Sequence, residues 1–233
     1  MTTKLINYTG WTIVLSASLY FVYSNALHYF SYNSNSFGPG YWPIAPYLLT
    51  HIAGGMTALL LGPFQFIAVI RKKYTRVHRT MGKIYLCSVV IGASASFYLS
   101  INKLIITDHA VTYGTGLAAL AFTWLLTGGM AYWAVRNKNF VQHREWMIRS
   151  YVITCAFTTF RLVYNILTIN FHTPEGPTAE IMAWACWAFP LLITEAFLQA
   201  SKIQRASKAL AKKKESNKTH VTITTVSADK STI

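Results

Sequence analysis

Six long apolar runs constrain the fold of this chain more than any other feature. Each run is continuous and lacks the alternation of barrel strands, and about 20 residues at roughly 1.5 Å per residue cross a hydrocarbon core. Spanning segments must satisfy their own backbone hydrogen bonds, so these runs form helices. The sequence therefore predicts an all-α, polytopic transmembrane helix bundle. The expected spans are residues 11–30, 44–70, 81–101, 111–135, 146–169 and 181–200.

Basic residues gather in alternate loops. Lys and Arg are frequent at 71–79 and at 136–144, whereas the loop at 31–43 has neither. Short loops rich in Lys and Arg stay in the cytoplasm, so we expect a multi-pass protein of the inner or plasma membrane with both termini inside. The net charge of +14 is then explained by contact with anionic lipid headgroups, and we expect no nucleic-acid partner.

The end of the chain has a different composition. Residues 202–233 are rich in Lys, Ser and Thr and poor in aromatic side chains, which is typical of disordered segments. We therefore expect a six-helix transmembrane domain at 1–201 and a basic, disordered cytoplasmic tail at 202–233.

Two His-Arg pairs, His78-Arg79 and His143-Arg144, each mark the point where a basic loop meets an apolar run. We expect His78 to begin the third helix and His143 to precede the fifth. Both helices start at the same predicted face, so the two rings lie at similar depth. The second and third helices thus resemble the fourth and fifth as a parallel duplication, an arrangement that places sites at the repeat interface.

Three further histidines, His28, His51 and His109, lie toward the opposite face, so depth gives an inner pair, His78 with His143, and an outer set. Neutral imidazole is an axial ligand of haem iron, and facing helices of a bundle can hold a haem between two such rings. We predict His51, His78, His109 and His143 as the cofactor ligands. The alternative is that they are structural residues at helix starts and packing interfaces.

Arg161 falls well inside the fifth run. Arginine at membrane depth is costly and usually has a partner, but the one carboxylate well inside a predicted span, Glu195, lies at a different depth. We expect the partner of the Arg161 guanidinium to be a haem propionate, a quinone oxygen or a lipid phosphate. Arg149 is a second candidate cofactor-binding residue, or it extends to the lipid headgroups.

Three motifs carry a family resemblance: His51-I-A-G-G, His78-R-x-x-G and His143-R-x-W-M-I-R-S. With them, residues 10–200 resemble a widespread family of predicted multi-pass bacterial-type membrane proteins whose domain bears a number instead of a function. The resemblance implies a fold and a membrane location, and no reaction.

The same histidines give a looser resemblance to di-haem four-helix transmembrane cytochromes of the ascorbate-oxidising type. His78 and His143 would match the cytoplasmic-side pair, and His51 and His109 the outer pair. The resemblance implies a haem-b protein that transfers electrons, with a quinone or another redox partner. The alternatives are a cofactor-free transporter or assembly and interaction protein, and a metal-dependent membrane enzyme, so whether the chain is an enzyme stays open.

Overall fold

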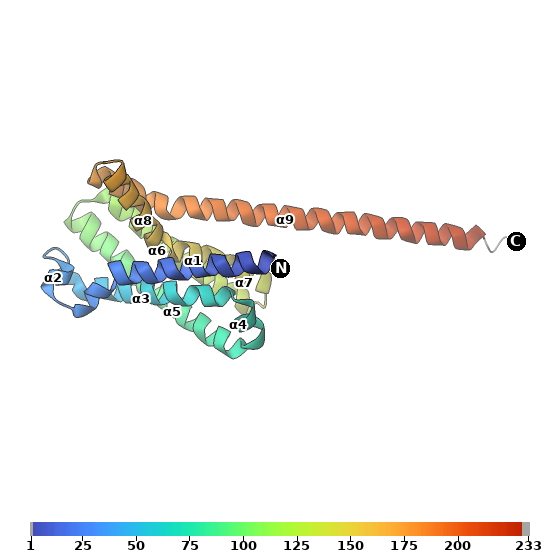
Figure 1. The fold of residues 1–233 in the computed structure, drawn as a ribbon, viewed down its shortest axis with the longest axis horizontal. Helices are drawn as coiled ribbons and strands as arrows, with labels where there is room; N and C mark the ends of the chain where they lie inside the picture. The colour runs from blue at the N-terminus through green and yellow to red at the C-terminus, as the bar shows by residue number, and fades with distance from the viewer. Residues whose placement is uncertain (1, 230–233) are drawn as a thin grey trace. The chain divides into compact units, whose positions relative to one another are not determined.

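The computed structural model describes the backbone of residues 2–229 and the side chains of residues 10–211, and the described part is helical without strands (Figure 1). It forms two units, 1–191 and 192–233. The α-helices are α1 (Thr2–Asn25), α2 (Ser34–Phe37), α3 (Ala45–Phe66), α4 (Ala68–Lys73), α5 (Thr75–Leu99), α6 (Val111–Arg136), α7 (Phe140–Thr154), α8 (Ala156–Asn165) and α9 (Glu175–Asp229). The shorter helical segments are η1 (Leu27–Ser31), η2 (Trp42–Ile44), η3 (Ser100–Thr107) and η4 (Ile166–Asn170).

Five helical runs among the described residues are long and apolar enough to cross a membrane. They are Trp42–Phe66, Thr75–Thr107, Val111–Arg136, Phe140–Asn170 and Glu175–Ala211. They contain most of each of the second to sixth runs expected from the sequence. The first expected run overlaps α1, and its crossing of the membrane stays a prediction.

The third and fifth helices begin earlier than expected, at Thr75 instead of residue 81 and at Phe140 instead of residue 146, six residues in each case. Hydropathy marks where a chain becomes apolar, whereas a helix begins where its first N–H groups find acceptors. The side chain of Asn139 supplies one by accepting a hydrogen bond from the Gln142 N–H at 3.1 Å. His78 and His143 therefore lie inside helices, and the expectation that they mark the helix starts is wrong.

Two other boundaries also differ. α1 ends at Asn25, short of residue 30, where the Asn25 side chain donates to the Phe21 carbonyl at 3.3 Å. α9 continues as helix to Asp229, although we expected disorder from residue 202. Ala, Lys, Glu and Gln, all good helix formers, dominate the first part of that segment. Residues 230–233 of the expected tail lie outside the described residues.

α5 is the central helix of the first unit. It packs against α3 on one side and α6 on the other, and α6 packs in turn against α7, so two helical hairpins form the core. Tyr85, Val89 and Ala93 of α5 are fully buried. Large apolar side chains such as Phe122 and Trp133 are exposed on α6, as expected of a helix that faces hydrocarbon.

The α3–α5 crossing brings two backbones into contact. A Cβ atom placed on Gly54 would lie 2.8 Å from the Gly92 Cα and 2.8 Å from the Ser88 carbonyl oxygen. Small residues allow this close approach of membrane helices. The crossing fixes α3 against α5 at the level of His51, which lies one turn before Gly54.

Buried hydroxyl groups join α5, α6 and α7. The Tyr85 hydroxyl lies 2.9 Å from Ser150 Oγ and 2.9 Å from Thr154 Oγ1. Trp124 Nε1 donates to the same Thr154 oxygen at 2.9 Å. Each polar group of this network has a partner, as buried polar groups require.

Candidate functional site

A cavity of about 320 Å³ lies inside the first unit, bounded by α1, α3, α5, α6 and the α7–α8 run. Its volume is at the lower end of the range of small-molecule sites, roughly 300–1,000 Å³. The wall is mostly apolar and aromatic, with a few polar groups. The residues that bear on its chemistry are His51, Thr158, Arg161, Tyr113, Trp124 and Phe157.

His51 holds a defined orientation in this wall. Its Nδ1 lies 2.9 Å from the carbonyl oxygen of Gly92, and because a carbonyl only accepts, Nδ1 carries the hydrogen. In the neutral ring Nε2 is then the acceptor. The edge of the ring contacts Phe157, with centroids 6.0 Å apart. A backbone carbonyl on one nitrogen is also how proteins orient metal-binding histidines, so His51 is prepared to bind a ligand through Nε2.

Arg161 of α8 lines the same cavity. Among the described residues it makes no hydrogen bond or ion pair, as we expected from the lack of a carboxylate at its depth. His51 lies nine residues from Trp42 and Arg161 nine residues from Asn170, at the ends of their spans. Both therefore lie about 14 Å along the helix from the same end of the bundle.

A groove of about 500 Å³ between α1 and the α8–η4 run adjoins the cavity. Thr158 and Arg161 line both, so they lie where the cavity meets the groove. The Thr158 hydroxyl is buried and has no hydrogen-bond partner among the described residues. The groove is otherwise lined mainly by apolar and aromatic side chains of the two helices: Ala17, Tyr20, Phe21, Leu162, Ile166 and Ile169.

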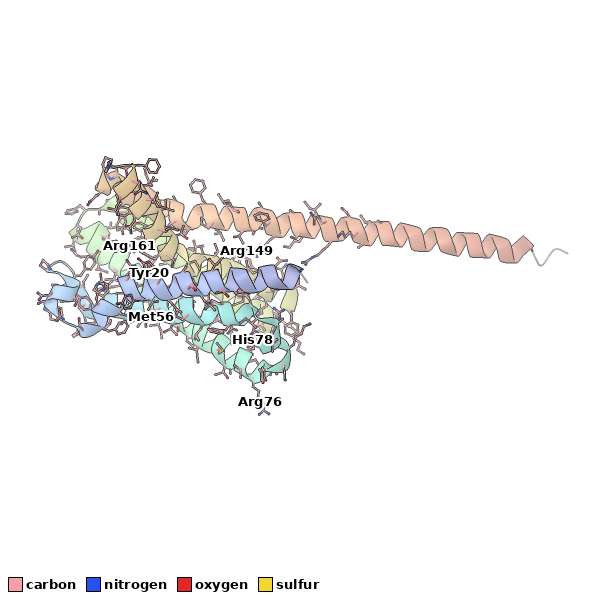
Figure 2. The ribbon with its side chains drawn as sticks, in the orientation of Figure 1. Tyr20, Met56, Arg76, His78, Arg149 and Arg161 are labelled. Carbon is pink, nitrogen blue, oxygen red and sulfur yellow. The ribbon has the colours of Figure 1, made fainter. Side chains whose placement is uncertain are left out.

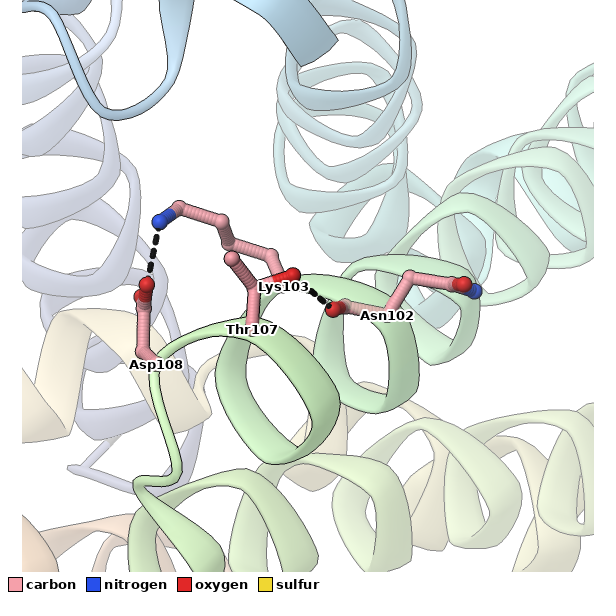
Figure 3. Close-up of polar contacts among 4 residues, drawn as sticks. All are labelled: Asn102, Lys103, Thr107 and Asp108. Atoms are coloured by element: carbon pink, nitrogen blue, oxygen red, sulfur yellow. Dashed lines mark hydrogen bonds and ion pairs between the residues drawn. The ribbon is translucent and has the colours of Figure 1, made fainter.

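The π-helical segment η3 lines part of the cavity with Ser100 and Leu104. Figure 3 shows the polar contacts along this segment. Lys103 and Asp108 form an ion pair there, and the Thr107 hydroxyl donates to the Asn102 carbonyl at 2.7 Å. Lys103 Nζ also lies 5.7 Å from the ring centroid of Tyr41, which lines the cavity. Burial and, next, the negative charge of Asp108 raise the pKa of Tyr41, against the opposing charge of Lys103.

His78 and His143 both lie at the other end of the bundle, which we call the basic end because it holds the Lys- and Arg-rich stretches at 71–79 and 136–144. Each is the fourth residue of its helix, α5 and α7, and they stand seven residues before Tyr85 and Ser150, whose hydroxyls lie 2.9 Å apart. His143 Nδ1 lies 2.9 Å from the Ala131 carbonyl, whereas His78 Nδ1 is buried and makes no hydrogen bond among the described residues. Figure 2 shows Arg161 and Met56 away from the end that holds His78.

His109 does not share the cavity that His51 lines. It lies exposed in the turn between η3 and α6, with a φ of 55°, and it does not line the cavity. The chain reverses direction at this left-handed residue, which places its side chain on the outside. The two outer histidines therefore do not form a pair in this structure.

Arg149 lies in the basic half of α7 and is buried. Its guanidinium carbon is 4.6 Å from the ring centroid of Trp146, and Nη1 is 3.9 Å from Glu145 Oε2. The four-residue spacing of Glu145 and Arg149 is one that sequence reasoning could have used. The prediction from the sequence also missed Thr158, although Thr158 lies three residues before Arg161 on the same helix face.

No three His, Cys, Asp or Glu side chains come together as a metal site in the part of the chain that the structure describes. A family model for predicted membrane proteins, DUF2306, matches residues 48–198. The chain belongs to the DUF2306 family. The family confirms the membrane location, and its matched range contains His51, Arg161 and both His-Arg pairs. Comparison with curated proteins and with solved structures gives no match.

Proposed function

We propose that this DUF2306 protein binds one haem b at its basic end, with His78 and His143 as axial ligands, and transfers electrons between a quinone and a redox partner. The observation that carries the proposal is that these two histidines stand at equivalent positions of α5 and α7, seven residues before Tyr85 and Ser150, whose hydroxyls lie 2.9 Å apart. A haem held by two histidines supplies one-electron chemistry. The protein supplies the ligands, their orientation and the surrounding charge.

The residues at the basic end fit such a group. The hydrogen bond from His143 Nδ1 to the Ala131 carbonyl leaves Nε2 available and fixes the ring plane. His78 Nδ1 is buried without a hydrogen-bond partner among the described residues, so no hydrogen bond through this atom holds the ring in its present orientation. Arg71 and Arg79 act electrostatically on His78 and would offset the negative charge of the propionates. His109 is exposed, so a second haem between His51 and His109 is not part of the proposal.

A cofactor-free transporter or interaction protein is the second candidate. The observation that favours it is the cavity with its adjoining groove, which could admit a molecule without any haem. In that case the His143–Ala131 hydrogen bond serves to hold α7 against α6, and His78 is a packing residue.

Visible spectroscopy tests the proposal. The protein, purified in mild detergent after expression with haem supplied, is expected to show a Soret band and, on reduction with dithionite, a sharp α band. His143→Ala and His78→Ala should each remove nearly all bound haem, since each removes one axial ligand. His109→Ala, at an exposed histidine, is the matched control and should retain the spectrum.

Folding of each variant is checked by circular dichroism and size-exclusion chromatography. A wild-type protein that is folded and colourless would overturn the haem proposal in favour of the cofactor-free candidate. Retention of the spectrum in both His78→Ala and His143→Ala would also overturn it, because another pair of ligands would then be needed.

A further inference from the structure

We infer that the cavity at His51 and Arg161 binds the head of an isoprenoid quinone, with the tail in the α1–α8 groove. The inference names the membrane-soluble partner of the proposed electron transfer and rests on that function only for the quinone's role. Binding of the quinone requires no haem, because neither His78 nor His143 lines the cavity.

Hydrogen-bond donors gather on one side of the site. Arg161 and Thr158 both lie on α8 and line the cavity, and neither makes a hydrogen bond among the described residues. Arginine only donates, and a threonine hydroxyl can donate. Together they suit a ligand oxygen that accepts, such as a quinone carbonyl.

The site also has a hydrogen-bond acceptor, His51 on α3. Because His51 Nδ1 donates to the Gly92 carbonyl at 2.9 Å, Nε2 of the neutral ring accepts and needs a donor from the ligand. The hydroxyl of a quinol is such a donor, whereas the ionised carboxylate of a fatty acid has none. The donor and acceptor inventory therefore favours the quinone–quinol couple over a fatty acid.

The cavity wall suits the ring of a quinone, and the groove suits its tail. Tyr113, Trp124 and Phe157 line the cavity, and aromatic side chains pack well against a flat ring. The groove joins the cavity at Thr158 and Arg161, and Leu162 and Ile169 are exposed along it. A tail of isoprene units in this groove would contact its apolar side chains and would pass the polar Ser24, Asn25, Asn165 and Asn170 that also line it.

Decylubiquinone is the probe. Its affinity for the protein in lipid nanodiscs is measured by quenching of tryptophan fluorescence, and that of its quinol form by competition. Arg161→Gln should weaken binding of both forms by about tenfold, a loss of about 1.4 kcal/mol. Thr158→Val should weaken binding without harming the fold. His51→Phe should weaken the quinol more than the quinone, because only the quinol donates to Nε2.

Arg136→Gln is the matched control, because it removes an exposed arginine at the end of α6 and should leave both affinities unchanged. Unchanged affinity in Arg161→Gln would overturn the inference. So would displacement of the quinone by dodecanoate that depends on Arg161 but not on His51, since an anionic lipid would then be the ligand.

The two proposals fail separately. A colourless protein that binds decylubiquinone through Arg161 would sustain the quinone site and overturn the haem. A coloured protein that loses its spectrum in His143→Ala but does not bind decylubiquinone would sustain the haem and overturn the quinone site.

Discussion

Gly54→Ala is expected to lower the free energy of unfolding by about 3 kcal/mol or more, at the upper end of what overpacking costs. The new methyl group would lie 2.8 Å from the Gly92 Cα, 2.8 Å from the Ser88 carbonyl oxygen and 2.9 Å from the Gly92 nitrogen. All three are backbone atoms that no rotamer change can move, so α3 and α5 must separate. Separation would also stretch the His51–Gly92 hydrogen bond. Denaturation in mixed micelles, followed by circular dichroism, measures the effect.

Gly55→Ala is the control for this prediction. A Cβ atom on Gly55 meets nothing within 4 Å, so the variant should be as stable as the wild type or up to about 1 kcal/mol more stable, from helix propensity. Equal stability of the two variants would show that the α3–α5 crossing is not as close as described.

Hydropathy was sufficient to predict the class of fold. Runs of apolar residues can satisfy their backbone in a membrane only as helices, and the helical bundle and the membrane location are both confirmed. Helix starts could not be read in the same way. Residues 75–80 and 140–145 are mainly polar or charged, with Val77, Phe140 and Val141 as the apolar exceptions. They are helical nonetheless, because backbone hydrogen bonding, joined at α7 by the Asn139 cap, continues each helix beyond the apolar stretch. The orientation across the membrane stays a prediction from the charge of the loops.

The site was only partly predictable. Charge and depth drew attention to Arg161 and His51, and both line one cavity. Depth could not pair histidines, however, because the side of the bundle that a residue faces depends on helix rotation and on local turns. His109 had the expected end of the bundle but the wrong face, since the left-handed turn at a φ of 55° exposes it. Thr158 was missed because hydroxyl-bearing residues are common in such spans, and Tyr41 because it falls in the loop at 31–43. Only the folded cavity distinguishes them.

Thr154→Val is expected to reduce the free energy of unfolding by about 1–3 kcal/mol, the usual cost of leaving a buried polar group unsatisfied. Valine keeps the shape of threonine but removes the oxygen that accepts from Trp124 Nε1 at 2.9 Å. Tyr85 retains Ser150 as a partner at 2.9 Å, so the loss falls mainly on the indole N–H. The same micelle denaturation assay gives the value, and Trp124 emission should change with it because the indole loses its hydrogen bond.

Thr158→Val makes the same change one turn later and separates structure from binding. The Thr158 hydroxyl is buried with no partner, so replacing it by a methyl group removes no hydrogen bond and should leave stability unchanged or slightly raised. A stable Thr158→Val variant with weakened decylubiquinone binding, beside a Thr154→Val variant that is less stable, is the expected pattern. If Thr158→Val were as destabilising as Thr154→Val, its hydroxyl would serve the fold and would not be held for a ligand.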